Sequence, residues 1–379
     1  MHRRAAPRLP TTTDKETRVA LASSDSYRTV VVGAGPAGAL AALHAAAVGS
    51  VLLVEQSALP RSKSCGGMLH HHTLRTLAEY GDVPPAIVLK PAHVNFRYRD
   101  WDRDIRRATA LEFLNVDRAG FDAWLLGLLP ESVEVVAGCA LKDLEQTQSG
   151  VSALLKSGDE TLPVACENLV GADGARSQVR RWLGVAGTAT YVTLQDFVQL
   201  KAPIEPYFDC IYLRGIGDAF GYAYVVPKGD VAIVGSVFYP KTKRPGEKHD
   251  AVLAVLRDAL PALGDSVARE AAAALSVRSA EDVVPGIGRV LLAGEAGGFM
   301  SPTSGEGISY AVNSGRAAGL AIAAGDSAGA LAAYARDVAP IVSNITRKLR
   351  WLPFMESRAG KYLAGFVPTP IVSKVTEGL

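Results

Sequence analysis

The most constraining feature of the sequence is the segment at residues 29–55, TVVVGAGPAGALAALHAAAVGSVLLVE. It begins with a short β-branched apolar run, continues through a glycine-rich turn and an alanine-rich stretch, and ends with a second apolar run and an acid. This order predicts a strand, a tight turn, a helix and a second strand. The segment therefore predicts an α/β domain of the Rossmann type.

The turn has the sequence GAGPAG, and each of its glycines has a physical role. Gly33 lets the chain leave the strand sharply, Gly35 lets a pyrophosphate approach the backbone, and Gly38 lets the helix pack closely on the sheet. The free N–H groups of the helix then point at the phosphates. Glu55 follows about twenty residues later, where a carboxylate accepts hydrogen bonds from ribose hydroxyls and repels a 2′-phosphate. We therefore predict a dinucleotide site and expect it not to select NADP; a turn of this type without a ligand is the alternative.

Composition excludes several classes of protein. The chain has 379 residues, a formal net charge of +2 and 21% charged residues, which gives no signature of nucleic-acid binding and favours a small-molecule partner. Its four cysteines are widely separated and follow no secretory signal, so we expect a reduced, cytoplasmic protein. Residues 1–26 are expected to form a flexible extension. No segment has about eighteen uninterrupted apolar residues, so any membrane contact is expected to be peripheral.

Two further glycine-rich motifs follow. Residues 171–180, GADGARSQVR, place Asp173 between two glycines at the end of a predicted strand. Nucleotides bind at such strand ends in doubly wound sheets, although a plain strand-to-helix turn has the same pattern. Residues 289–308 predict a strand that turns at Glu295 and a loop that opens a helix at residues 305–308. The acid suits a ribityl hydroxyl and the helix N-terminus suits the pyrimidine edge of a flavin, although a structural turn explains this pattern equally well.

A cysteine loop and a run of histidines lie between the first two motifs. Residues 65–67, Cys-Gly-Gly, let the backbone lie flat against a ligand with the thiol beside it; a plain turn with a buried cysteine is the alternative. Three histidines at residues 70–72 follow at the predicted start of a helix. Consecutive helical residues point about 100° apart, so we expect these histidines not to form a metal site.

Other segments alternate between sheet and helix patterns. Alternating aromatic and charged residues predict strands at residues 91–109 and 110–115 and further strands within residues 187–239. Residues 240–280 are predicted to be charged loop and helix. The aromatic strands suit an apolar substrate chamber, with ordinary sheet core as the alternative. The candidates for substrate contact are Tyr212, Tyr222 and Tyr224.

Taken together, the three motifs resemble the FAD-binding signature of the geranylgeranyl-reductase branch, including its CbrA-like members, of the para-hydroxybenzoate-hydroxylase-like flavoproteins. The matching segments are GAGPAG with its acid, KSCGG at residues 63–67, GADGARSQVR and LLAGEAGGFMSPTSGEGI, and the resemblance extends from about residue 27 to residue 350. Two departures stand out. Glu295 occupies a position where the wider superfamily usually has aspartate, and residues 222–227, YAYVVP, replace the tryptophan pattern of flavin halogenases, which weakens a halogenase interpretation.

The resemblance implies an α/β fold in which a Rossmann-like FAD-binding domain of the para-hydroxybenzoate-hydroxylase type is interleaved with a mostly antiparallel β-sheet substrate domain and followed by a C-terminal helical region. The implied limits are residues 27–90, 112–186 and 281–330 for the FAD-binding domain, 91–111 and 187–280 for the substrate domain, and 331–379 for the helical tail. The flavin ring would lie between the two domains. The residues implied to contact FAD are Gly33, Gly35, Pro36, Ala37, Gly38, Glu55, Gln56, Lys63, Cys65, Gly66, Gly67, Arg118, Asp173, Gly294, Glu295, Gly305, Glu306, Gly307 and Ile308.

The leading hypothesis for function is reduction of a carbon–carbon double bond in an apolar, isoprenoid-like substrate. Reduced flavin would give a hydride to one alkene carbon while an acid protonates the other. Cys65 is the candidate acid, because a thiol in water is mostly protonated at neutral pH. The alternative is a flavin monooxygenase that hydroxylates an aromatic or apolar small molecule; the fold is shared, and KSCGG favours reduction. A third class is an FAD-bound protein without catalysis.

The sequence leaves the electron donor open among NADPH, NADH and another reductant, because no second GxGxxG domain is evident. It also leaves the oligomeric state open. The final segment, residues 347–379, mixes basic residues with Trp351, Phe354, Tyr362 and Phe366. Docking of a C-terminal helix onto the core is the favoured interpretation, and a membrane-surface helix that delivers a lipid substrate is the second.

Overall fold

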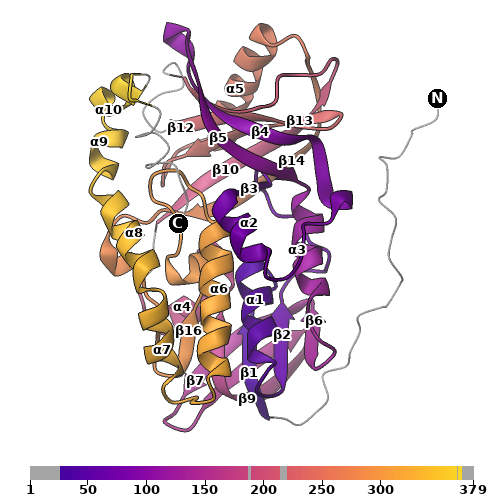
Figure 1. Cartoon of the computed structure of the whole chain (residues 1–379), viewed down its shortest axis with the longest axis vertical. Helices are drawn as coiled ribbons and strands as arrows, with labels where there is room; N and C mark the ends of the chain where they lie inside the picture. Colours follow the sequence, from indigo (N-terminus) through magenta and orange to yellow (C-terminus); the bar gives the residue numbers. More distant parts are fainter. Residues whose placement is uncertain (1–25, 187–188, 214–219, 365, 369–379) are drawn as a thin grey trace, which may run out of the picture.

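The computed structural model describes residues 26–186, 189–213, 220–364 and 366–368, and two large sheets dominate it (Figure 1). The first sheet lies in the lower half of the view and the second in the upper half, with helices packed between and beside them. The predicted α/β fold with a mostly antiparallel second sheet and C-terminal helices is confirmed. The predicted N-terminal extension at residues 1–26 lies outside the described residues except for Ser26, which begins the first strand, and the end of the tail at residues 369–379 also lies outside them.

The first sheet is organised around β1 (Ser26–Val32), which pairs in parallel with β2 (Val51–Glu55) and with β9 (Glu160–Gly171). Two more parallel strands extend it, β6 (Val133–Ala137) beyond β2 and β16 (Val290–Leu292) beyond β9. The apolar, buried stretches of these strands at residues 30–32, 51–54, 169–171 and 290–292 suit a sheet that is covered on both faces. Because the strands are parallel, β1, β9 and β16 end at one edge of the sheet, and the three glycine-rich motifs that follow them meet there.

Helix α1 (Pro36–Ala45) follows the first motif and packs against α6 (Ile308–Ala323), which follows the third. Small residues allow the two helices to touch at their backbones. A Cβ on Gly315 would collide with the carbonyl oxygen of Ala37, and a Cβ on Gly319 would lie 2.6 Å from that of Ala41. This contact therefore fixes the N-termini of both helices relative to the shared sheet edge.

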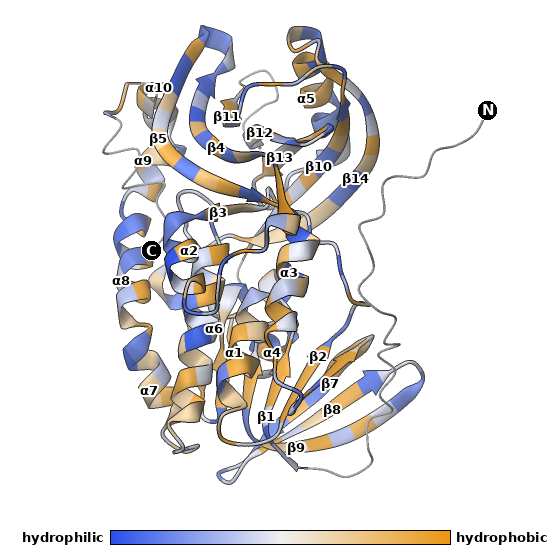
Figure 2. Ribbon diagram, turned by 45° about the vertical axis from the view of Figure 1, so that its right-hand side comes forward, coloured by the Kyte–Doolittle hydropathy of each residue, from blue (hydrophilic) through white to orange (hydrophobic). Residues whose placement is uncertain are grey.

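The second sheet is strongly curved and lies over the carboxyl edge of the first (Figure 2). Its strands are, in spatial order, β14 (Leu263–Leu275), β10 (Thr190–Leu200), β13 (Val231–Phe238), β12 (Phe220–Lys228), β11 (Tyr207–Tyr212), β4 (Val88–Asp100), β5 (Ile105–Val116) and β3 (Met68–His70). All neighbours are antiparallel except β4 and β11. The sheet thus presents one broad surface toward the edge where the motifs meet.

Shorter elements complete the fold. A hairpin of β7 (Cys139–Gln146) and β8 (Val151–Ser157) extends from β9, and β15 (Gly286–Ile287) pairs with β16. The remaining helices are α2 (His71–Leu77), α3 (Arg118–Gly127), α4 (Gln178–Trp182), α5 (Pro245–Ala259), α7 (Ala330–Asp337), α8 (Ala339–Leu349), α9 (Leu352–Glu356) and α10 (Arg358–Ala364). Figure 1 shows α7 to α10 running from the first sheet up to the second. Within the described ranges, no helix is both long and apolar enough to cross a bilayer.

Two local predictions were wrong. Residues 263–275, expected to be loop or helix, form β14, because pairing with β10 along most of their length outweighs the helix propensity of their alanines. The first hairpin of the second sheet turns at residues 101–104, where Asp104 has a left-handed backbone with φ of 52°, and not at residue 109. Strands β4 and β5 therefore also run through the predicted domain limits at residues 90/91 and 111/112.

The contact between α1 and α6 gives a prediction for stability. We expect Gly315→Ala to lower the free energy of unfolding by about 1–3 kcal/mol, because the added methyl forces the two helices apart. Gly127 in the last turn of α3 has nothing within 4 Å of an added Cβ and serves as the control. Gly127→Ala should raise the free energy of unfolding by roughly 0.5 kcal/mol through its better helix propensity. Urea unfolding of both variants measures this, and equal effects in both would contradict the packing argument.

Candidate active site

A cavity of about 1010 Å³ lies where the carboxyl edge of the first sheet faces the second sheet. It is lined by the turns after β1, β9 and β16, by the cysteine loop and by the aromatic strands β4, β11 and β12. The structure therefore brings every predicted site residue to one cavity except Gly38, which does not line it. A Cβ on Gly38 would collide with the carbonyl oxygen of Gly33, so this glycine allows the helix to approach the turn.

The first motif forms a cradle at one end of the cavity. Gly33 has a backbone φ of 105°, which residues other than glycine rarely adopt. Gly35 is the N-cap residue of α1. The guanidinium of Arg61 lies over this turn, since its Nη2 would be 2.9 Å from a Cβ on Gly35. A positive group above the N-terminus of a helix suits a pyrophosphate. Sequence reasoning missed Arg61, because nothing in its own neighbourhood marks it out from other loop arginines.

Charged groups fix Arg61 in this place. Its Nε lies 3.5 Å from Glu55 Oε2 and its Nη2 lies 3.3 Å from Asp122 Oδ2. Glu55 also accepts hydrogen bonds from the backbone N–H groups of Ala34 at 3.0 Å and Ser57 at 3.1 Å. A carboxylate offers about four lone pairs, so the same Glu55 side chain still has capacity to accept from a ribose hydroxyl.

Asp122 connects this cradle to the cysteine loop. Its carboxylate accepts from Arg118 Nε at 2.8 Å, and Arg118 in turn interacts electrostatically with Cys65. Burial disfavours the Arg118 charge, but Asp122 and Cys65 outweigh it and raise the pKa of Arg118 above its ordinary value. The Cys65 sulfur also accepts a hydrogen bond from Gly67 N at 3.4 Å. The thiol is thus held at the cavity wall beside a permanent positive charge.

Lys228, at the end of β12, holds the cysteine loop from the other side. Its Nζ donates to the carbonyl oxygens of Gly67 at 3.1 Å and Val116 at 3.0 Å. Burial lowers the pKa of Lys228 to about 8, while Cys65 and Asp117 oppose that shift. This lysine ties the second sheet to the loop beside the first. It was visible in the sequence as part of a Pro-Lys-Gly turn, but the local pattern gives no sign that its side chain points back to residues far away in the chain.

Two of the predicted cofactor acids are engaged in helix capping. Asp173 accepts from Ser177 Oγ and from the backbone N–H of Gln178, at the start of α4. Glu306 accepts from both the backbone N–H and the hydroxyl of Ser309 at the start of α6. Burial raises the pKa of both carboxyls, although these hydrogen bonds oppose the shift. Both residues line the cavity, and their side chains hold its turns in place.

Glu295 differs from these two acids. Its Oε2 is buried and has no hydrogen-bond partner among the described residues, while its Oε1 lies 3.9 Å from Lys63 Nζ. A buried acceptor without a donor is costly, so such an atom at a cavity wall indicates a donor on a bound molecule. A ribityl hydroxyl supplies such a donor, and the residues present therefore fit a flavin.

Aromatic side chains from the second sheet line the other end of the cavity. The tyrosines there are the predicted Tyr212, Tyr222 and Tyr224 together with Tyr98, Tyr191 and Tyr239, which sequence reasoning missed. The hydroxyl of Tyr224 donates to Gln195 Oε1 at 3.1 Å, and that of Tyr222 would be 3.5 Å from a Cβ on Gly305. Burial raises the pKa of Tyr222 and of Tyr224, so both phenols stay neutral. The chamber is therefore largely apolar, with hydroxyl groups along its walls.

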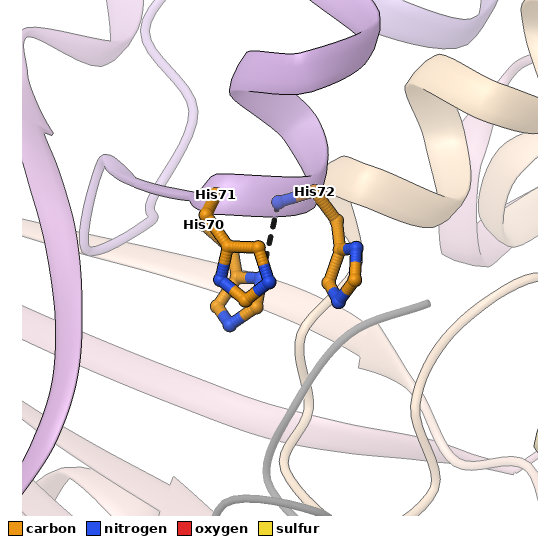
Figure 3. A group of neighbouring side chains, drawn as sticks. All are labelled: His70, His71 and His72. Carbon is orange, nitrogen blue, oxygen red and sulfur yellow. Dashed lines mark hydrogen bonds between the residues drawn. The ribbon is translucent and has the colours of Figure 1, made fainter.

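The three histidines at residues 70–72 lie closer together than expected (Figure 3). His70 has an extended backbone and caps α2 through its Nδ1, which accepts from His72 N at 3.4 Å, so only His71 and His72 obey the helical spacing. One ring nitrogen of each histidine lies within 4.8 Å of the others. The expectation that the three side chains point apart was therefore wrong. Burial and then His71 lower the pKa of His70 to about 3 and that of His72 to about 4, with Lys348 adding to both. That lysine and the positive end of α2 both disfavour a cation, and we assign no metal to this cluster.

Comparisons with known proteins agree with this geometry. Residues 130–348 match a family model described as FAD binding domain. Protein CbrA of Escherichia coli O157:H7 is 27% identical over 300 residues, which cover 76% of this chain and 82% of that protein. A geranylgeranyl bacteriochlorophyll reductase-like protein from Thermoplasma acidophilum has the same fold, with a TM-score of 0.76 and 20% identity over 93% of this chain and 92% of that one.

Two structures of proteins with other reactions have the same fold. The flavin-dependent brominase Bmp2 gives a TM-score of 0.71 and 19% identity, covering 90% of this chain and 89% of that one. OxyS anhydrotetracycline hydroxylase from Streptomyces rimosus gives a TM-score of 0.67 and 20% identity, covering 93% and 76%. The fold alone therefore leaves the reaction open.

The buried position of Lys228 predicts a pH dependence of stability. Below about pH 8 its ammonium is charged in both the folded and the unfolded chain, and the folded chain bears the cost of burying it. Between about pH 8 and 10.5 the folded chain has released this proton while the unfolded chain keeps it, so this group makes folding more favourable as the pH rises.

We therefore expect the free energy of unfolding of the wild type, relative to that of Lys228→Met, to rise by about 2 kcal/mol when the pH is raised from 7.5 to 9.5. Urea titrations of both proteins at each pH measure the difference. Lys201→Met, which removes an exposed lysine, is the control and should show no such change. A constant difference between the wild type and Lys228→Met would show that burial does not perturb this lysine.

Proposed function

The chain belongs to the FAD binding domain family of flavin-dependent oxidoreductases, and on this basis we propose that it reduces a carbon–carbon double bond in an apolar, isoprenoid-like substrate. The observation that carries the proposal is the position of Cys65. Its thiol lies at the wall of the cavity between the cofactor cradle and the aromatic chamber, next to Arg118. A thiol in this place is suited to deliver a proton to a substrate bound in the chamber.

The chain's own residues account for each part of FAD. The turn at residues 33–38, the N-terminus of α1 and Arg61 would hold the pyrophosphate, with Glu55 on the adenosine ribose. The unpartnered oxygen of Glu295 would accept from the ribityl chain. The loop at residues 305–308, at the N-terminus of α6, would face the pyrimidine end of the ring.

When bound and reduced, FAD supplies a hydride to one carbon of the double bond. Cys65 gives its proton to the other carbon, so that the double bond becomes a single bond with two new C–H bonds. Arg118, the positive charge beside the sulfur, stabilises the thiolate that remains until water returns the proton. Lys228 keeps the loop in place through its two carbonyl contacts. The proposed roles are therefore acid for Cys65 and support for the other two.

The chamber favours an apolar substrate. Phenylalanines 96, 113 and 208 and the methyl groups of Ala272–Ala274 contribute to its walls alongside the tyrosines. Neutral phenols add weak hydrogen-bonding sites without adding charge. Such a chamber accepts a long hydrocarbon and excludes water from the double bond.

The second candidate is a monooxygenase that hydroxylates an aromatic or apolar small molecule. One observation favours it: the tyrosine hydroxyls in the chamber would suit the polar edge of an aromatic substrate. Oxygen dependence separates the two reactions, because reduction of an alkene consumes the flavin's electrons without oxygen.

Arg61 provides a test of the cofactor site. We expect Arg61→Ala to raise the Kd for FAD at least about tenfold, because a charge-assisted contact to the pyrophosphate is lost. Arg316→Ala, which breaks an exposed ion pair with Glu79 at 2.7 Å, should leave the Kd unchanged. Fluorescence titration of the apoprotein with FAD measures both. An unchanged Kd in Arg61→Ala would remove Arg61 from the cofactor site.

Cys65 provides the test of the reaction. The purified protein is loaded with FAD, reduced with dithionite without oxygen and mixed with prenylated lipids, and flavin reoxidation is followed by absorbance. We expect reoxidation by the alkene, slowed at least about a hundredfold in Cys65→Ala because the proton donor is lost. Cys65→Ser, which keeps the size but is a weaker acid, should also be slow.

Cys166→Ala is the control for this experiment, since Cys166 is a buried cysteine of β9 that does not line the cavity. It should retain the wild-type rate. Reoxidation of the wild type only after oxygen is admitted would refute the reductase and favour the monooxygenase.

A further inference from the structure

Exposed apolar side chains gather at the C-terminal end of the described chain. Ten large apolar residues are exposed in the described ranges, and five of them lie within residues 351–366. These five are Trp351, Phe354, Tyr362, Leu363 and Phe366. The other five are scattered over α4, α5, β14, β15 and α6. A cluster of this kind marks an interaction surface more often than a scatter of single residues does. We call the described residues 351–364 and 366 the C-terminal surface.

This surface is continuous with the cavity. Trp351 and Phe354 are exposed and also line the cavity, together with their neighbours Leu352 and Met355. Helix α9 therefore forms part of the cavity mouth, and Figure 1 shows it at the end of α8, beside the second sheet. An apolar path leads from the outside of the protein into the aromatic chamber.

Polar contacts hold α9 and α10 to the rest of the protein. Glu356 accepts two hydrogen bonds from Arg278 Nη1, at 2.6 and 2.7 Å, and Arg278 also donates to Tyr191 Oη at 3.2 Å. The guanidinium of Arg103, in the turn between β4 and β5, lies 3.4 Å from the ring centroid of Tyr362 and donates to its carbonyl oxygen at 3.2 Å. Apart from the buried Leu352, these helices thus use mainly ion pairs and hydrogen bonds toward the protein and leave large apolar side chains outside. An ordinary surface helix instead exposes mainly polar side chains.

We propose that the C-terminal surface docks on a lipid bilayer and takes an apolar substrate from it directly into the cavity. Exposed tryptophan, tyrosine and phenylalanine side chains next to basic residues are typical of helices that lie in the membrane interface. Arg347 and Arg350 are exposed at the end of α8, immediately before this surface. Residues 347–379 contain six basic and two acidic residues, and even without the buried Lys348 the basic residues outnumber the acidic ones, so an anionic bilayer complements their charge. The proposal rests on the proposed function in one respect, that the substrate is apolar.

A flotation experiment with the FAD-loaded protein tests this. Vesicles of phosphatidylcholine alone, and of phosphatidylcholine with phosphatidylglycerol, are centrifuged with the protein in a density gradient. We expect the wild type to float with the anionic vesicles and less with the neutral ones. The variant Trp351→Ser/Phe354→Ser/Phe366→Ser should lose at least about tenfold in vesicle affinity, because three membrane-facing side chains become polar.

A matched control removes the same number of exposed apolar side chains elsewhere. The variant Trp182→Ser/Val267→Ser/Ile287→Ser replaces a tryptophan that is 47% exposed, compared with 57% for Trp351. It should float like the wild type. Circular dichroism confirms that both triple variants are folded. Failure of the wild type to float with either vesicle, or equal flotation of both triple variants, would overturn the proposal.

Other occupants of this surface would give different results. A wild-type dimer that dissociates in the Trp351/Phe354/Phe366 variant, without flotation, would indicate a second copy of the chain. Flotation that appears only after removal of residues 369–379 would indicate that the chain's own tail covers the surface. Either result would overturn the proposal.

A separate assay without vesicles, in which a short water-soluble prenyl alcohol reoxidises the reduced flavin, tests the reaction alone. Reoxidation without flotation would leave the proposed function standing and refute membrane docking. Flotation without reoxidation by any alkene would refute the proposed function and leave membrane docking standing.

Discussion

Parallel pairing of β1 with β9, and of β9 with β16, is the constraint on which the rest of the structure depends. It places the ends of three strands, separated by more than a hundred residues along the chain, side by side at one edge. Backbone hydrogen bonds continue this alignment into the turns, since Ala172 N donates to Val32 O and Ala293 N donates to Gly171 O. The cradle for a dinucleotide follows from this register, and the close contact of α1 with α6 keeps the two helix N-termini aimed at it.

A chain of charged groups then connects the cradle to the cysteine loop at the cavity wall. Glu55, Arg61, Asp122 and Arg118 follow one another at ion-pair distances and end at the thiol of Cys65. Lys228 reaches the same loop from the second sheet. Binding of a phosphate near Arg61 and the position of the thiol are therefore linked through a few stiff contacts. Under the proposed function, this arrangement would bring a cofactor held by one sheet and a substrate held by the other into register at Cys65.

Local sequence was sufficient for the features that depend on local backbone chemistry. The glycine-rich turns, the acid at the end of β2 and the cysteine loop were predicted from spacing and residue type, and all of them meet at the cavity. Arg61 and Lys228 were missed because their importance depends on contacts with residues far along the chain. Strand β14 was missed because tertiary pairing overrode the propensity of its alanines. The position of α9 at the cavity mouth likewise depends on Arg278, which no local pattern connects to Glu356.

The central claim is that one cavity holds FAD with its ring beside Cys65, between the two sheets. A crystal structure of the FAD-loaded protein tests this most directly. The account predicts the pyrophosphate over residues 33–38 within reach of Arg61, a ribityl hydroxyl on Glu295, and the flavin ring between the cysteine loop and residues 305–308. Electron density for the ring outside this space, or a Cys65 thiol turned away from it, would contradict the account.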